Sequence, residues 1–209
     1  MRRPGTALFV ALTLVTILGC PLTLAAATPT LVQHVSTASN QLERGNGFII
    51  VLPNVALPNN CLILTLTYAS SSSRTVSVVD NNGTNTWVRG PSTNSGSLTT
   101  TLYYVLGVKA GTQTITVTFD TSLTNFHAAV SEFYNVATSA AIDGSIATSN
   151  ATGPSVAAGS FATSTDGDLI YQYAIDVQGG VGDRSSSGIT AGAGFSLLSA
   201  CRILSAAAH

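Results

Sequence analysis

The chain has 209 residues, of which 45% are hydrophobic and only 8% are charged, and its formal net charge is −1. So few basic residues exclude a nucleic-acid binder that works through a basic patch, and the hydrophobic content excludes a disordered chain. The 24 Ser, 28 Thr and 19 Gly residues favour an all-β domain, because Thr suits exposed strand faces.

Residues 1–27 have the pattern of a secretory signal peptide. Two arginines precede an apolar run at 7–18, and the alanines at 25–27 provide a cleavage site. The apolar run is too short to span a bilayer comfortably. We therefore expect a secreted protein, extracellular or periplasmic. The alternative is a lipobox-like sequence ending in Cys20, which would make the protein lipid-anchored and give it a membrane partner.

Apolar and polar residues alternate along several stretches of the remaining chain, as in strands with one buried face. The clearest stretches are 61–68, 112–119 and 168–177, and in each of them we expect the hydroxyl-bearing face to point outward. Further strands are predicted at 31–36, 48–52, 74–80, 85–89, 97–106, 125–135, 141–147 and 194–204.

Turn signals such as Asn82-Gly83 separate these stretches. We therefore expect residues 28–209 to form a single domain, a two-sheet antiparallel sandwich of jelly-roll-like form with about ten to twelve short strands. The chain ends soon after the strand at 194–204, so a truncated C-terminus is an open alternative.

Residues 77–87, SVVDNNGTNTW, resemble part of a β-sandwich module that recurs in bacterial secreted and surface proteins. The resemblance covers about residues 45–180. It implies a jelly-roll-like sandwich, mostly without assigned activity, and carries over no catalytic residue. The Gly-Asn pair of the module is spread here into Gly83-Thr84-Asn85. The other matching pieces are Tyr103-Tyr104, Ala110-Gly111, Thr116-Val117-Thr118 and Glu132-Phe133-Tyr134.

A carbohydrate site is predicted around Trp87. Alternation places Trp87 on a polar strand face with Asn85 and Arg89, and places Tyr103 on another face with threonines. A hairpin of 85–89 and 97–106 would put Tyr103 roughly 13 Å along the strand from Trp87, a spacing that suits two sugar units. The alternative is that Trp87 plugs the end of the sandwich.

Two further sites are expected from side-chain chemistry. Asp80, Asp166 and Asp168 provide oxygen ligands on turns, so calcium is possible, although such side chains usually cap their own backbone. No other cofactor is expected. Cys61 and Cys201 remain after cleavage and predict a disulfide in an oxidising compartment; the alternative is two buried thiols.

Enzymatic activity is not expected. Histidines are few and no Gly-x-Ser-x-Gly elbow is present. Glu132 lies within a mainly apolar strand face, where it would serve either as the acid of a glycan-cleaving enzyme or, more typically, as a structural partner of Arg74 or Arg89. The expected function is a secreted binding or surface module for carbohydrate or another cell-surface polymer. The alternative is a purely structural envelope or adhesion domain.

Overall fold

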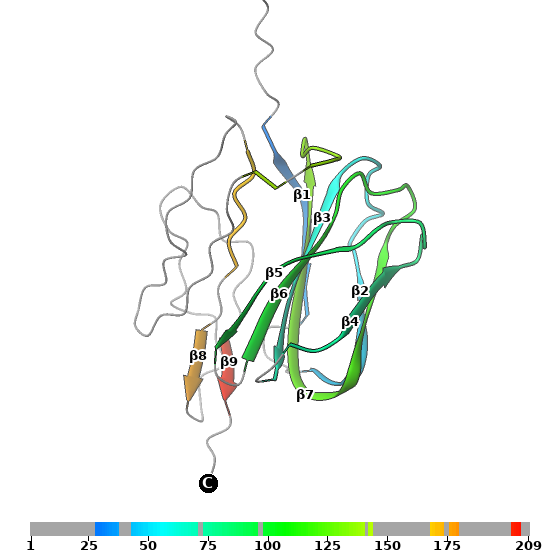
Figure 1. Cartoon of the computed structure of the whole chain (residues 1–209). Coiled ribbons are helices and arrows are strands. Elements are labelled where there is room, and N and C mark those ends of the chain that lie inside the picture. Colours follow the sequence, from blue (N-terminus) through cyan, green and yellow to red (C-terminus); the bar gives the residue numbers. More distant parts are fainter. Residues whose placement is uncertain are drawn as a thin grey trace, which may run out of the picture.

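The computed structural model describes residues 28–37, 43–70, 73–95, 98–140, 142–143, 168–173, 176–179 and 202–205. Within these ranges the chain is all β, and no helix is long and apolar enough to cross a membrane. The strands are β1 (Thr30–Ser36), β2 (Glu43–Val51), β3 (Cys61–Ala69), β4 (Val76–Asp80), β5 (Val88–Ser95), β6 (Leu98–Val105), β7 (Thr114–Tyr134), β8 (Asp176–Gly179) and β9 (Arg202–Ser205) (Figure 1).

The predicted two-sheet antiparallel sandwich is confirmed, and β7 belongs to both of its layers. The second half of β7 lies between β1 and β3 in a five-stranded layer of order β1-β7-β3-β6-β5. The first half lies between β2 and β4 in a three-stranded layer. In the part of the chain that the structure describes, these two layers hold eight strand segments, fewer than the ten to twelve expected.

The prediction of separate strands at 112–119 and 125–135 is wrong, because the 21 residues of β7 continue from one layer into the other. Figure 1 shows the curve of β7 at the end of the molecule where this happens. The ladder with β2 shifts register at Gly45 and Gly47 along this curve. A Cβ on Gly47 would lie 2.5 Å from the carbonyl oxygen of Val117, so only glycine permits this close approach.

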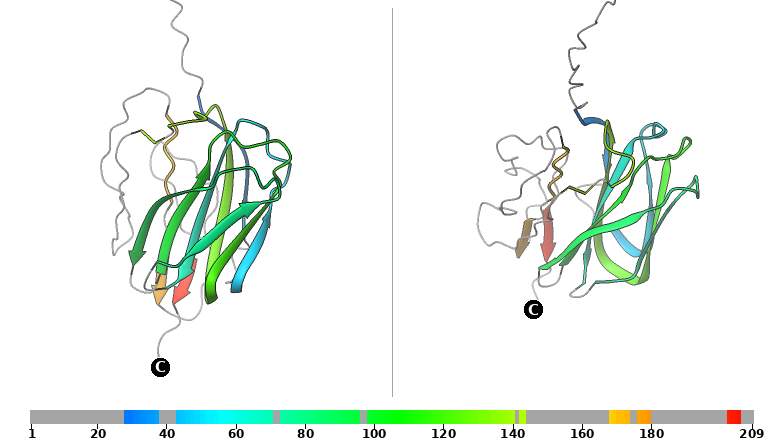
Figure 2. Two further views of the ribbon diagram at one scale, coloured as in Figure 1. Left: turned by 45° about the vertical axis from the view of Figure 1, so that its right-hand side comes forward. Right: turned by 45° about the horizontal axis from the view of Figure 1, so that its top comes forward.

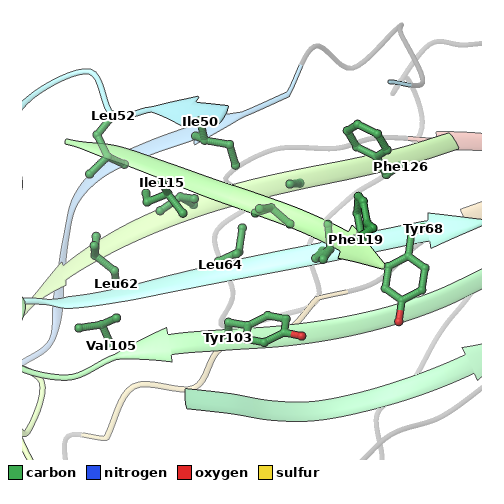
Figure 3. Packing of buried hydrophobic residues seen from close by; sticks show 14 of the residues in the cluster. Ile50, Leu52, Leu62, Leu64, Tyr68, Tyr103, Val105, Ile115, Phe119 and Phe126 are labelled. Carbon is green, nitrogen blue, oxygen red and sulfur yellow. The ribbon is translucent and has the colours of Figure 1, made fainter. Parts of the chain in front are cut away.

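The core lies between the two layers and follows the predicted alternation. In β3 the set Leu62, Leu64, Leu66 and Tyr68 is fully buried, and in β7 Ile115, Val117 and Phe119 face it (Figure 3). Phe48 and Phe126 stack nearby with ring centroids 4.6 Å apart. Each fully buried side chain of this size contributes roughly 1.5–3 kcal/mol to folding.

The outer face of the five-stranded layer is covered in part by residues 168–173, which form no ladder (Figure 2). The ring of Tyr171 meets that of Phe133 edge-on at 6.0 Å, and the Tyr173 hydroxyl lies 3.2 Å from Thr67 Oγ1. Thr65 and Thr67 lie on this outer face, as predicted, but they are buried, so the expectation that the face is exposed to solvent is wrong. Of the strand expected at 168–177, residues 168–173 form no ladder, and 176–177 belong to β8, which pairs in parallel with β9. The strand expected at 141–147 lies almost wholly outside the described residues.

Candidate functional site

The loop after β4 is organised by the carboxylate of Asp80. Its Oδ1 accepts hydrogen bonds from the backbone N–H groups of Asn82 (3.0 Å) and Gly83 (3.2 Å). Its Oδ2 accepts from Asn85 Nδ2 (3.1 Å) and from the indole Nε1–H of Trp87 (2.8 Å). Gly83 has a φ of 71°, which glycine adopts without strain. The DNNGTNTW sequence thus builds a self-capped loop around one buried acid.

This loop is also tied to the turn that precedes β7. Asn81 Oδ1 accepts from the backbone N–H of Gln113 at 2.8 Å. Asn85 Oδ1 accepts from the Lys109 N–H at 2.8 Å, and Asn85 Nδ2 donates to Thr112 Oγ1 at 2.7 Å. The side chain of Asn85, a predicted sugar-binding residue, therefore hydrogen-bonds within the protein, and Asn85 lies outside the pocket described below.

Trp87 is half-buried and packs against the core cluster, which is the placement expected of a plug at the end of the sandwich. The predicted hairpin exists, but its register differs. Arg89 lies directly opposite Tyr103, and β5 continues through Gly90 and Pro91 instead of turning there. Proline is tolerated because β5 is an edge strand and the ladder has a bulge after Arg89. The expected 13 Å spacing of the two aromatics is therefore wrong.

Tyr103 is 5% exposed, so the prediction that its ring is exposed is wrong. The threonines that share its face, Thr99 and Thr101, lie between the layers, and Thr99 Oγ1 donates to the carbonyl of Ser70 at 3.0 Å. The threonines on this face of β6 are therefore not a sign that the face is exposed to solvent. Burial raises the pKa of the Tyr103 phenol, and the nearby Arg89 guanidinium acts to lower it.

A pocket of about 460 Å³ opens between the two layers. β4 is the last strand of one layer and β5 the last strand of the other, so the sandwich is open between them. The lining consists of two arginines, two aromatic rings, two small hydroxyl residues and two valines: Arg74, Arg89, Trp87, Tyr103, Ser73, Thr75, Val76 and Val78.

Three of the four predicted sugar-binding residues, Trp87, Arg89 and Tyr103, meet at this pocket. The wall formed by residues 73–78 was not predicted as part of a site. The sequence predicts Arg74 only as a partner for Glu132, because nothing in the local sequence indicates that β4 faces β5 across the layers.

Glu132 is fully buried and is not part of the pocket lining. Its Oε1 accepts from the Leu57 backbone N–H at 2.8 Å and from Asn60 Nδ2 at 2.6 Å, and its Oε2 accepts from Gln33 Nε2. The predicted pairing with an arginine is wrong, since amide groups surround the carboxylate instead. A catalytic acid must reach its substrate, so this position suits a structural clamp between β7, β1 and the loop before β3.

The calcium site expected at Asp80, Asp166 and Asp168 stays a prediction, because one of its three ligands is outside the described residues. Asp80 already accepts four hydrogen bonds, Asp168 lies on the segment that covers the five-stranded layer, and Asp166 lies outside the described residues. Among the residues whose placement is given, no group of three or more His, Cys, Asp or Glu side chains could hold a metal ion.

Cys61 begins β3 and is buried; it has no disulfide partner among the described residues, and burial raises the pKa of its thiol to about 12. Cys201 lies outside the part of the chain that the structure describes. The disulfide between Cys61 and Cys201 therefore stays a prediction.

A second polar cluster, which the sequence did not indicate, lies under residues 168–173. His34 Nδ1 is 2.9 Å from Ser131 Oγ, and His127 Nδ1 is 3.4 Å from the Tyr173 hydroxyl. Burial lowers the pKa of both histidines, and neither Nε2 has a hydrogen-bond partner among the described residues. Ser131 is fully buried, so its contact with His34 offers no access for a substrate.

Comparison of the chain with protein-family models, with curated proteins and with solved structures finds no match. The resemblance to a secreted β-sandwich module therefore stays a prediction.

Proposed function

We propose that the protein is a non-catalytic carbohydrate-binding module, and that the pocket between β4 and β5 is its sugar site. The observation that carries the proposal is the meeting of Trp87, Arg89 and Tyr103 at this pocket. The sequence alone predicts all three as sugar-binding residues, from their side-chain chemistry.

The pocket has the size and the chemistry that a sugar requires. A volume of about 460 Å³ is within the range of small-molecule sites. Val76, Val78 and the indole of Trp87 provide apolar surface for the carbon face of a ring. Ser73 and Thr75 are exposed hydroxyl residues that can exchange hydrogen bonds with ring hydroxyls.

The same lining favours binding over cleavage. Glycosidases generally need two carboxyl groups flanking the bond that breaks. The described lining contains no Asp or Glu. Glu132, the candidate acid from the sequence, is clamped by amides elsewhere in the sandwich.

Export fits this function, because glycans and other cell-surface polymers are found outside the cytoplasm. We infer secretion from the signal-peptide pattern of residues 1–27, with lipid anchoring through Cys20 as the alternative. The oxidising compartment that either route reaches would allow a bond between Cys61 and Cys201.

The test is a glycan array probed with the full chain as it is exported, followed by titration of each hit. Thr75→Trp places a large side chain at the pocket wall and should abolish binding. Ser77→Trp is the matched control, because Ser77 is an exposed β4 residue that does not line the pocket. A purely structural domain predicts no glycan binding, and equal loss of binding in both variants would contradict the proposed site.

A further inference from the structure

The pocket gathers most of the positive charge that the structure describes. Side chains are described for three Lys and Arg residues, Arg74, Arg89 and Lys109, and the first two line the pocket. Arg89 is exposed on β5 beside Tyr103. Arg74 is half-buried just before β4, on the other wall. Two arginines therefore line one pocket from its two opposite walls.

Neither guanidinium is neutralised by a carboxylate in the described part of the chain. Arg74 Nε is buried and has no hydrogen-bond partner. The acid beside this wall, Asp120, uses its Oδ2 to accept the Thr75 backbone N–H at 3.2 Å and makes no ion pair with either arginine. Asp80 is occupied by its four donors. Like charges on the walls of one concave site repel each other and attract an anion.

Guanidinium groups select particular anions. The planar fork of Arg matches the two oxygens of a carboxylate or sulfate, and such charge-assisted bonds are about twice as strong as neutral ones. The remaining lining is neutral: Ser73 and Thr75 supply hydroxyls, and Val76 and Val78 supply apolar surface. An anionic group attached to a hydroxyl-rich ring therefore matches all parts of the pocket.

We propose, resting on the carbohydrate-binding function above, that the ligand is an acidic glycan whose carboxylate or sulfate binds between Arg74 and Arg89. The charged group fixes the orientation of the sugar, and the hydroxyl residues contact the rest of the ring.

The experiment is calorimetric titration of the exported full chain with three probes: trigalacturonate, its fully methyl-esterified form, and a κ-carrageenan tetrasaccharide. The first carries carboxylates, the second has the same rings without charge, and the third carries sulfate without carboxylate. At least one charged probe should bind about tenfold or more tighter than the ester, as expected for a charge-assisted bond. The tighter charged probe identifies the anion.

Variants assign the effect to the two arginines. Arg89→Gln and Arg74→Gln should each weaken the charged probe by about tenfold or more, and should weaken the ester by much less. Lys109→Gln removes the same charge outside the pocket and should change neither; thermal melts confirm that the variants are folded.

If the ester binds as tightly as the acid and Thr75→Trp abolishes both, the carbohydrate site stands and its preference for anions is wrong. If no probe and no array glycan binds, both proposals fail.

Discussion

Replacing Trp87 separates its role in the fold from its role in the pocket. The indole is half-buried against the core, and its Nε1–H donates to Asp80 Oδ2 at 2.8 Å. A hydrogen bond to a charged group contributes about 1.5–3 kcal/mol, and truncating a buried Trp to Ala costs about 3–5 kcal/mol. Because the ring is only half-buried, Trp87→Ala should lower the free energy of unfolding by about 3–4 kcal/mol in total.

Trp87→Phe keeps an aromatic ring but loses the indole N–H and part of the ring area, so it should cost about 1.5–3 kcal/mol, less than Trp87→Ala. Urea unfolding followed by circular dichroism measures both variants, and it is preferred to fluorescence because Trp87 is the sole tryptophan. A loss below about 1 kcal/mol in Trp87→Ala would refute the packing argument. Trp87→Phe is then the variant for sugar titrations, since its fold is less disturbed.

Three other predictions concern residues outside the pocket. Glu132→Ala leaves buried amide donors without an acceptor and should lower the free energy of unfolding by at least about 2 kcal/mol. Asp120 is an exposed acid with one backbone hydrogen bond, so Asp120→Ala should lower it by less than about 1 kcal/mol. Similar losses for the two variants in urea titrations would contradict the structural role of Glu132. Burial lowers the pKa of His34 and His127 below the ordinary 6.5, so the unfolded chain binds protons first and stability should fall as the pH drops below about 6.5. His127→Gln should weaken this pH dependence, and an unchanged profile of unfolding free energy against pH would count against it. Burial raises the pKa of the Cys61 thiol to about 12, so under reducing conditions iodoacetamide should label it only after the protein is unfolded. Mass spectrometry measures the labelling, and rapid labelling of the native protein would be inconsistent with a buried thiol.

The sandwich could be predicted because alternation in β3 and β7 reports directly which side chains face the core. The path of the chain through the two layers could not be predicted from the sequence. Residues 112–119 and 125–135 each look like a complete strand, and their alternation does not indicate that the chain continues as one strand, β7, from one layer into the other.

The pocket could be predicted only in part. Trp87 and Arg89 stand out because aromatic and cationic residues are scarce in this chain. The position of Arg74 depends on the packing of β4 over β5 and β6, which local sequence does not encode. Thr99 and Thr101 beside Tyr103 are buried for the same reason. Polar residues on a strand face predict exposure to solvent only when no second layer covers that face.

The central claim is that the pocket beside Trp87 binds sugar, and the sole indole of the chain gives a direct test. A proton–nitrogen NMR spectrum of the labelled protein contains one indole Nε1–H signal. We predict that this signal shifts progressively and saturates on titration with a glycan identified by the array. Thr75→Tyr, which adds a large side chain but no second indole, should abolish the shift, and Ser77→Tyr should preserve it. Binding of the glycan with no movement of the Trp87 signal would contradict the account.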